Sequence, residues 1–343
     1  MNNDLIEIFI LTYSRSKMLE TAIRSVLNQT VKTKLTVVDN HSPDDTPQMI
    51  ERLKAEGADF TYIRRAENGG AGANAATAKE HFSYPYVMIF HDDDALHPQY
   101  IETALRILSE NEDVSLICSS FVDLKQAADL KHEHHNEIHY KLIESVDLFA
   151  AYVFSSHILK ASESLAYPSV IYRSDIYKHA KGRNDLYGKL DDGPFVIECA
   201  RGGKIVQITT PLVCIRRHLG QDSHDPATAC TIEQIFNGNA FYKRFMEKRP
   251  DTMKLFWMIC GRHLKAHSNF GNGTFGILTF IRRAIAEHQI KLRSFLLVFE
   301  YALQRVLGLK RPLLLHRYLW WKTHLLFDER IVYLDWLDEN QRK

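Results

Sequence analysis

The stretch that decides the fold reads Val87-Met88-Ile89-Phe90-His91-Asp92-Asp93-Asp94. Its first four residues are apolar or aromatic, which is typical of a strand buried on both faces of a parallel sheet. The three carboxylates that follow repel one another, so a cation is expected beside them. In proteins, Mg²⁺ and Mn²⁺ bind to one or two carboxylates together with substrate phosphates. The stretch therefore predicts either a metal and phosphate site at the carboxyl edge of an α/β sheet or an acidic helix N-terminus.

Strands and helices alternate along the part of the chain that surrounds this stretch. Apolar runs predict strands at Leu5–Leu11, Leu35–Val38 and Phe60–Ile63, and apolar residues at helical spacing follow the first two. An alanine-rich helix is expected up to about His81, and another strand is expected at Val114–Cys118. This alternation predicts a mostly parallel sheet flanked by helices, which is an α/β fold of the Rossmann-like kind.

Polar segments follow three of the predicted strands. Thr12–Arg15 follows the first strand and Asp39–Asp45 the second, so both are expected at the sheet edge that carries the acidic triplet. The segment Asn68–Asn74 is rich in glycine and opens a helix, where the backbone can approach a phosphate. An ordinary turn before a helix explains this third segment equally well, because it matches neither common phosphate-binding motif.

The middle of the chain contains a second pair of carboxylates. Asp191 and Asp192 precede a helix whose apolar face includes Phe195, and they would either cap that helix or present a general base. Strands are predicted before and after them, and Arg216–His218 ends the last of these strands. The predicted strands are Tyr167–Arg173, Ile205–Ile208 and Leu212–Ile215.

Two further regions are predicted from their composition. Residues 125–145 are polar and contain four histidines whose spacing fits no common metal site, so a solvated loop is expected there. These histidines are His132, His134, His135 and His139. From about Thr231 onward the strand pattern stops and apolar residues recur at helical spacing, which predicts a helical C-terminal region.

The charge is distributed unevenly, although the 343 residues carry a net charge of only +1. Residues 1–225 contain 24 Lys and Arg against 32 Asp and Glu, a net charge of −8, whereas residues 226–343 contain 19 against 10, a net charge of +9. The length and this split predict two domains, 1–225 and 226–343, with different partners. The near-zero total argues against nucleic-acid binding.

Cysteine usage and hydropathy suggest a cytoplasmic location. The five cysteines form no CxxC pair, which fits a reducing compartment and gives no sign of a zinc site or a disulfide framework. No secretory signal is expected at the N-terminus, and no apolar run reaches the ~18 residues that span a bilayer. The segment Leu313–Phe327 mixes aliphatic, aromatic and basic residues. It would lie at the inner face of the cytoplasmic membrane, pack on the rest of the chain or form a homodimer interface.

Taken together, these stretches resemble the family 2 glycosyltransferases of the GT-A fold over roughly residues 5–225. The resemblance rests on six features in a fixed order, of which the first two and the acidic triplet are the most specific. They are Ile10–Arg15, Val37–Asn40, Asn68–Asn74, Phe90–Asp94, Asp191-Asp192 with Gly203 downstream, and Arg217-His218 with Ser223.

The resemblance implies roles for individual residues in binding a nucleotide sugar, with UDP as the expected nucleotide. Asp39 would face the base and Asp94 would ligate Mn²⁺ or Mg²⁺, with His218 near the metal or the diphosphate. His91 receives no functional role. The other residues implied in donor binding are Thr12, Tyr13, Arg15, Asn68, Gly70, Asn74, Asp92 and Asp93.

The resemblance also implies an inverting transfer to a glycan or a lipid-linked saccharide, in the synthesis of a bacterial surface polysaccharide such as O-antigen or capsule. Asp192 would be the general base, with Asp191 as the alternative. The chain departs from the family pattern at Ser14, where Asn is commoner, at Ala73, where Arg often precedes the Asn, and at Asp191, where Glu is usual. The glycine segment and the triplet also resemble the galactofuranosyltransferase branch. A non-catalytic module that binds a nucleotide sugar or a glycan is the alternative from a different class.

Overall fold

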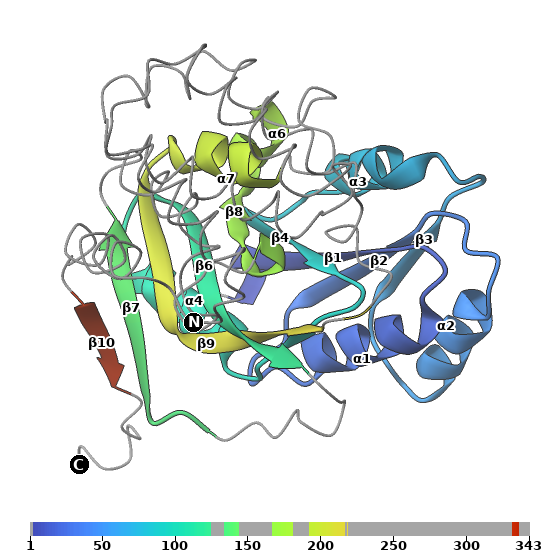
Figure 1. The fold of residues 1–343 in the computed structure, drawn as a ribbon, viewed down its shortest axis with the longest axis horizontal. Coiled ribbons are helices and arrows are strands. Elements are labelled where there is room, and N and C mark those ends of the chain that lie inside the picture. Colours follow the sequence, from blue (N-terminus) through green and yellow to red (C-terminus); the bar gives the residue numbers. More distant parts are fainter. Residues whose placement is uncertain are drawn as a thin grey trace, which may run out of the picture.

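A computed structural model describes residues 3–124, 134–143, 167–180, 192–216, 218 and 331–335. Within these residues the fold is one ten-stranded sheet with helices on both sides, and Figure 1 shows α1 and α2 below the sheet and α3, α6 and α7 above it. The strand order is β10-β7-β9-β6-β8-β4-β1-β2-β3, and the two-residue strand β5 pairs with β9.

The first part of the chain forms the predicted βα repeat. The strands β3, β2, β1 and β4 lie side by side and are parallel to one another. Helices connect them in sequence, so the expectation of a parallel sheet is confirmed for this half of the molecule. The elements are η1 (Asn3–Leu5), β1 (Ile6–Thr12), α1 (Ser16–Leu27), β2 (Lys34–Asp39), α2 (Thr46–Ala55), β3 (Thr61–Arg64), α3 (Gly70–Glu80) and β4 (Tyr86–His91).

The second part of the sheet is mixed in direction. Strand β8 lies between β4 and β6 and is antiparallel to both, whereas β6 and β9 are parallel to each other. The elements are β5 (Ala95–Leu96), α4 (Tyr100–Glu110), β6 (Val114–Leu124), β7 (Glu137–Ile143), η4 (Tyr167–Ser169), β8 (Ile171–Arg173), α6 (Ser174–His179), α7 (Asp192–Ala200), β9 (Lys204–Arg216) and β10 (Ile331–Asp335). The two strands expected over residues 205–215 are one continuous strand, β9, with register shifts in its pairing to β6.

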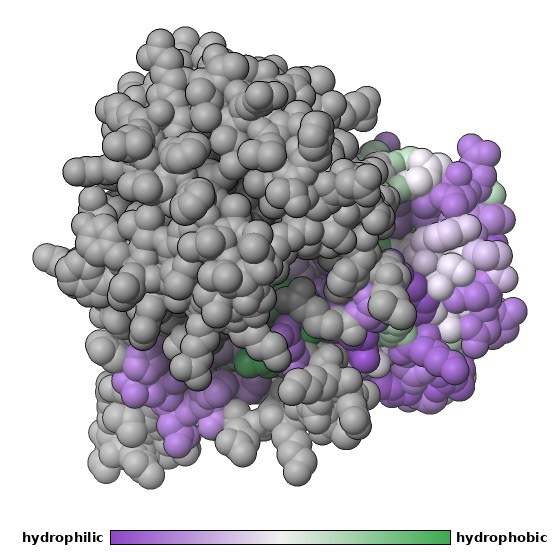
Figure 2. Space-filling model, in the orientation of Figure 1, coloured by the Kyte–Doolittle hydropathy of each residue, from purple (hydrophilic) through white to green (hydrophobic). Residues whose placement is uncertain are grey.

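The core follows the apolar runs of the sequence. Ile8, Phe9 and Ile10 of β1 are all fully buried, as are Val87 and Phe90 of β4, so both faces of these central strands are covered. Apolar side chains on α1 and α4 pack into the same cluster. In the view of Figure 2, the described surface around β3 and α2 is mostly hydrophilic. The strands that lead to the carboxyl edge of the sheet are therefore packed on both faces.

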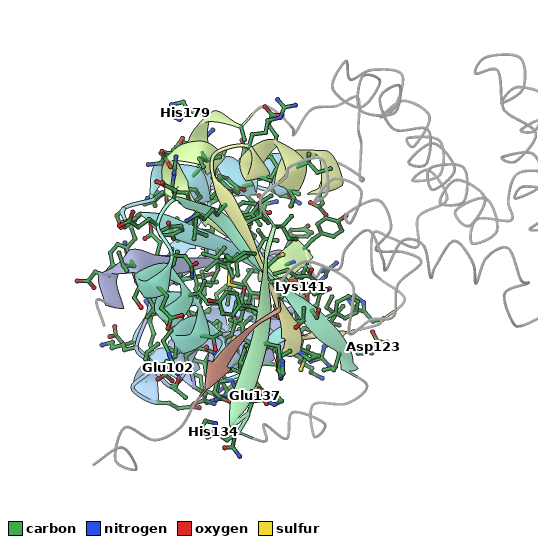
Figure 3. The ribbon with its side chains drawn as sticks, turned by 90° about the vertical axis from the view of Figure 1, so that its left-hand side faces the viewer. Glu102, Asp123, His134, Glu137, Lys141 and His179 are labelled. Carbon is green, nitrogen blue, oxygen red and sulfur yellow. The ribbon has the colours of Figure 1, made fainter. Side chains whose placement is uncertain are left out.

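The expected solvated loop at residues 125–145 is wrong for residues 137–143. These residues form β7, which is antiparallel to both β9 and β10. Its polar residues alternate with the buried Ile138 and Tyr140, so the segment reads as a strand with one face in the core. In Figure 3, His134 and Glu137 lie at one end of β7, with Lys141 further along it.

The C-terminal region is described only over residues 331–335. These residues form the strand β10, which corrects the expectation that strands stop after Thr231. The predicted helices and the segment Leu313–Phe327 lie outside the described residues, and the domain boundary at residue 225 stays a prediction. Among the described residues, no helix is long and apolar enough to cross a membrane.

Gly203 lies where the turn before β9 meets the start of β6. A Cβ atom added to Gly203 would lie 2.1 Å from the carbonyl oxygen of Asp113 and 3.4 Å from the backbone nitrogen of Ser115. The next residue, Lys204, donates its backbone N–H to the same Asp113 oxygen over 2.7 Å. Backbone meets backbone here, so no side chain can move aside, and the position needs glycine.

We therefore predict that Gly203→Ala lowers the free energy of unfolding by about 1–3 kcal/mol, because the added methyl group overpacks this contact. The matched control is Gly72→Ala in α3, where a Cβ would meet no atom within 4 Å. Alanine favours helix over glycine by about 0.5–1 kcal/mol, so the control should be slightly stabilised. Chemical denaturation of the three proteins measures both effects, and equal midpoints would contradict this account of Gly203.

Candidate active site

The parallel pairing brings the polar strand exits to one edge of the sheet. Thr12 at the end of β1 lies opposite Asp39 at the end of β2. On the other side of β1, Leu11 lies opposite His91, the last residue of β4. The expectation that these exits share an edge with the acidic triplet is therefore confirmed.

Asp92 is buried and is held by the last residue of β1 and by a residue of the turn that follows it. Thr12 Oγ1 donates to Asp92 Oδ2 over 2.8 Å, and Arg15 Nη1 donates to Asp92 Oδ1 over 3.1 Å. Burial raises the pKa of Asp92, whereas the Arg15 charge and the Thr12 hydrogen bond lower it. Both oxygens of this carboxylate therefore accept hydrogen bonds from the protein itself.

The side chain of Asp93 is contacted by an imidazole and a guanidinium. His218 Nε2 lies 2.9 Å from Asp93 Oδ2, and Arg15 Nη1 lies 3.4 Å from the same oxygen. The side chain of Arg216 reaches the backbone carbonyl of Asp93, to which its Nε donates over 3.0 Å. Residues from both ends of the GT-A-like region, Arg15 and His218, therefore meet on one carboxylate.

Asp94 is the most deeply buried member of the triplet, with 2% of its surface exposed. The backbone N–H of Arg216 donates to its Oδ1 over 2.9 Å, and His91 Nδ1 lies 3.7 Å from its Oδ2. Burial raises the pKa of Asp94 to about 6, although His91 opposes the shift. A buried carboxylate with this little compensation would gain from a nearby cation.

The donor atoms suit a hard divalent cation. One ligand atom from each of His91, Asp93 and Asp94 can be chosen so that all three lie within 4.8 Å of one another. Two carboxylate oxygens and an imidazole nitrogen form a set that Mn²⁺ or Mg²⁺ accepts. The predicted ligand Asp94 belongs to this cluster, while the predicted ligand His218 lies beside Asp93.

His91 is the member of the cluster that the sequence did not reveal. A single histidine at the end of a strand matches no common metal-binding spacing. Asp93 and Asp94, which lie beside it in the cluster, were already explained as part of the acidic triplet. Its position directly before the triplet was the available signal. The imidazole is half exposed, so it can turn toward a ligand that enters from solvent.

Asp39 is fully buried and enclosed by donors. Its Oδ1 accepts from the N–H and the hydroxyl of Ser42, at 2.9 and 2.6 Å. Its Oδ2 accepts from the hydroxyl of Tyr62 at 2.6 Å and forms an ion pair with Arg64 at 3.4 Å. Burial and the Asp39 carboxylate raise the pKa of Tyr62, so its hydroxyl stays protonated and donates. The network fixes the turn that follows β2.

The glycine-rich segment is ordered by asparagine side chains. Asn40 donates from Nδ2 to Asn68 Oδ1 over 2.7 Å, and its own Oδ1 accepts the Gly69 N–H over 3.1 Å. The Gly70 N–H donates to Asn68 Oδ1 over 2.9 Å. Asn74 is buried and donates to the carbonyl of Val38, 3.0 Å away. These contacts join the first turns of α3 and the segment before it to the end of β2.

Tyr13 is the exposed residue of the turn after β1, with 44% of its surface accessible. Ser14 follows with φ of 58°, in the left-handed region where Asn is better tolerated than most residues. The Ser14 N–H donates to Ser42 Oγ over 2.9 Å, which holds the turn against the Asp39 network. The hydroxyl of Ser42 therefore holds the backbone of Ser14 in this conformation, although the residue is not Asn.

Asp192 is the first residue of α7 and is half-buried. The helix is held by aromatic contacts, since Phe195 packs on Tyr177 with ring centroids 4.8 Å apart. The other candidate base, Asp191, lies outside the described residues, as do Arg217 and Ser223.

The sheet order, the glycine segment and the acidic site together define a GT-A fold. Among solved structures, it is similar to residues 1–349 of TarS from S. aureus in complex with UDP-GlcNAc, with a TM-score of 0.51 and 16% identity over 94% of this chain and 89% of that one. A mannosyltransferase from Pyrobaculum calidifontis in complex with GDP-Man and Mn²⁺ gives a TM-score of 0.53 and 15% identity over 94% and 84%.

The sequence comparisons give the family. The model of the family described as Glycosyl transferase family 2 matches residues 7–159. An uncharacterized glycosyltransferase of Methanocaldococcus jannaschii is 25% identical over 202 residues, which span 58% of this chain and 66% of that relative. The fold is therefore of the GT-A type, and both sequence matches support a glycosyltransferase, with residues 7–159 similar to family 2.

We predict that His91 and Asp93 both contribute to metal affinity. His91→Gln and Asp93→Asn should each weaken Mn²⁺ binding by about tenfold or more, because each removes one of a few ligands. Binding is measured by calorimetric titration of Mn²⁺ into the protein without nucleotide. The control is His81→Gln, an exposed histidine at the end of α3. Unchanged Mn²⁺ affinity in His91→Gln would remove His91 from the metal site.

Proposed function

We propose that the protein transfers a sugar from a nucleotide sugar to a hydroxyl of a saccharide acceptor, with inversion at the transferred carbon. The observation that carries this proposal is the buried acidic triplet at the end of β4. Thr12, Arg15 and His218 from distant parts of the chain converge on it, and His91 completes a metal-ligand set.

The residues of the triplet and the neighbouring His91 would have different roles. His91, Asp93 and Asp94 would hold Mn²⁺ or Mg²⁺, and a bound divalent cation would supply Lewis-acid stabilisation of the leaving diphosphate. Asp92 is committed to Thr12 and Arg15, so it would shape the donor pocket and keep the turn after β1 in place. Tyr13, exposed in that turn, is free to contact the nucleotide.

Asp192 would be the general base. A sugar hydroxyl is a weak nucleophile, and a carboxylate that takes its proton during attack typically contributes a factor of about 10²–10⁴. Asp192 belongs to α7, an element separate from β4, which fits a base on the acceptor side and a metal on the donor side. Direct attack would invert the configuration of the transferred carbon. Asp191 is retained as the alternative base.

The donor is proposed to be UDP-linked. The resemblance of the glycine segment and the triplet to family 2 enzymes supports this choice, with a galactofuranosyl donor as one alternative. The two structural neighbours are complexes with UDP-GlcNAc and with GDP-Man, so a guanosine donor belongs in the same screen.

The acceptor is proposed to be a glycan or a lipid-linked saccharide, in the synthesis of a bacterial surface polysaccharide. A cytoplasmic protein that contacts the inner face of the membrane peripherally would meet such an acceptor. The net charge of +9 over residues 226–343 supports attraction to anionic lipid. A homodimer remains an alternative use of the same region.

The first test is donor hydrolysis with Mn²⁺ in the absence of an acceptor, measured as release of the nucleoside diphosphate from a panel of nucleotide sugars. We expect slow hydrolysis by the native protein and a loss of about 10²-fold or more in Asp94→Asn and in Asp192→Asn. The control is Asp59→Asn, an exposed carboxylate that forms a surface ion pair with Lys32.

The outcome also separates the enzyme from a non-catalytic binding module. Such a module would bind a nucleotide sugar but release no nucleotide with any acceptor, and both aspartate variants would then match the native protein. Donor binding without turnover across a panel of acceptors would therefore overturn the proposal of catalysis.

A further inference from the structure

Arg65 lies at the same edge of the sheet as the candidate active site. It directly follows β3, and its backbone N–H donates to the carbonyl of Asp39 over 2.9 Å. Its own carbonyl lies 3.1 Å from His41 Nδ1. These contacts fix the backbone of Arg65 beside the turn that follows β2.

The guanidinium of Arg65 lies against the start of α3. A Cβ atom added to Gly69 would lie 2.7 Å from Arg65 Nη2 and 3.2 Å from Arg65 Cζ. The same atom would lie 2.8 Å from the methyl group of Ala73. The absence of a side chain at Gly69 therefore leaves the space beside this backbone that the guanidinium occupies.

The charge of Arg65 is not used within the described protein. Its Nη1 is buried and has no hydrogen-bond partner, and none of the carboxylates described lies within 4.0 Å of it in an ion pair. The other arginines near this edge are engaged. Arg15 binds Asp92, Arg64 pairs with Asp39, and Arg216 donates to the backbone of Asp93. An arginine N–H that is buried without an acceptor is costly, so the arrangement suits an anionic ligand.

We propose that Arg65 binds a phosphate oxygen of the donor's nucleoside diphosphate, an inference that rests on the proposed function. A guanidinium matches phosphate oxygens in charge and in the geometry of its donors. The segment beside it is already ordered, because Asn40 and Asn68 take the N–H groups of Gly69 and Gly70. Arg65 thus adds positive charge on the β3 side of the site, while the metal cluster lies at the end of β4.

The test compares ligands with and without the diphosphate. UDP, GDP, uridine and guanosine are titrated calorimetrically, with Mn²⁺ present, into the full-length native protein and into Arg65→Met. A hydrogen bond to a charged group is worth enough to change affinity about tenfold or more. We expect that loss for the diphosphate that the native protein binds, and no change for its nucleoside.

Two further variants complete the experiment. Arg24→Met removes an arginine of α1 that pairs with Glu20 and Glu56, so it controls for the lost charge and should bind as the native protein does. Arg65→Lys keeps the charge but loses the second donor arm, and it should recover part of the affinity. Thermal melting of each variant separates lost binding from lost folding.

The possible failures are distinct. Equal affinity of the diphosphate for the native protein and for folded Arg65→Met would overturn the role of Arg65 and leave the proposed function standing. Equal losses for nucleoside and diphosphate would also overturn it, because the effect would then not come from phosphate. Binding of neither UDP nor GDP to the native protein would overturn the proposed function and this inference together.

Discussion

The constraint on which the site depends is the burial of three consecutive carboxylates at the end of a central strand. Asp92, Asp93 and Asp94 leave β4 with almost no exposed surface, so their mutual repulsion is poorly screened. Residues from elsewhere in the chain contact these carboxylates and partly compensate their charge, namely Arg15, Arg216 and His218. Burial still raises the pKa of Asp94 to about 6. The remaining imbalance is what a divalent cation would relieve.

The topology of the sheet is what brings these partners together. Parallel pairing of β1, β2 and β4 places the ends of three strands at one edge of the sheet. The last residue of β9, Arg216, contacts Asp94 at this edge. The same edge carries the enclosed Asp39 and the glycine-rich start of α3. Negative charge gathers at β4 and an unused positive charge lies after β3 at Arg65, a division that suits a metal-bound diphosphate.

The βα repeat, the shared edge and the acidic site could all be predicted from the sequence, because long apolar runs and polar strand exits are local signals. The direction of β8 could not, since a three-residue strand carries no sign of its neighbours. The strand β7 was missed because polar residues are interspersed among its buried residues, Ile138, Tyr140 and Ile143. Three features of the site could not be predicted, because they depend on side chains that meet only after folding. They are the place of His91 in the metal cluster, the hydrogen bonds that enclose Asp39 and the position of the Arg65 guanidinium.

A metal site for a nucleoside diphosphate at the acidic triplet requires that binding of the metal and binding of the nucleotide be linked. If Mn²⁺ lies on the diphosphate, each ligand must strengthen the binding of the other by the same factor. Calorimetric titration of UDP and of GDP, each with Mn²⁺ and with a chelator, measures that factor. We expect Mn²⁺ to raise the affinity of one nucleotide by about tenfold or more. Nucleotide affinity that is the same with Mn²⁺ and with the chelator would contradict it.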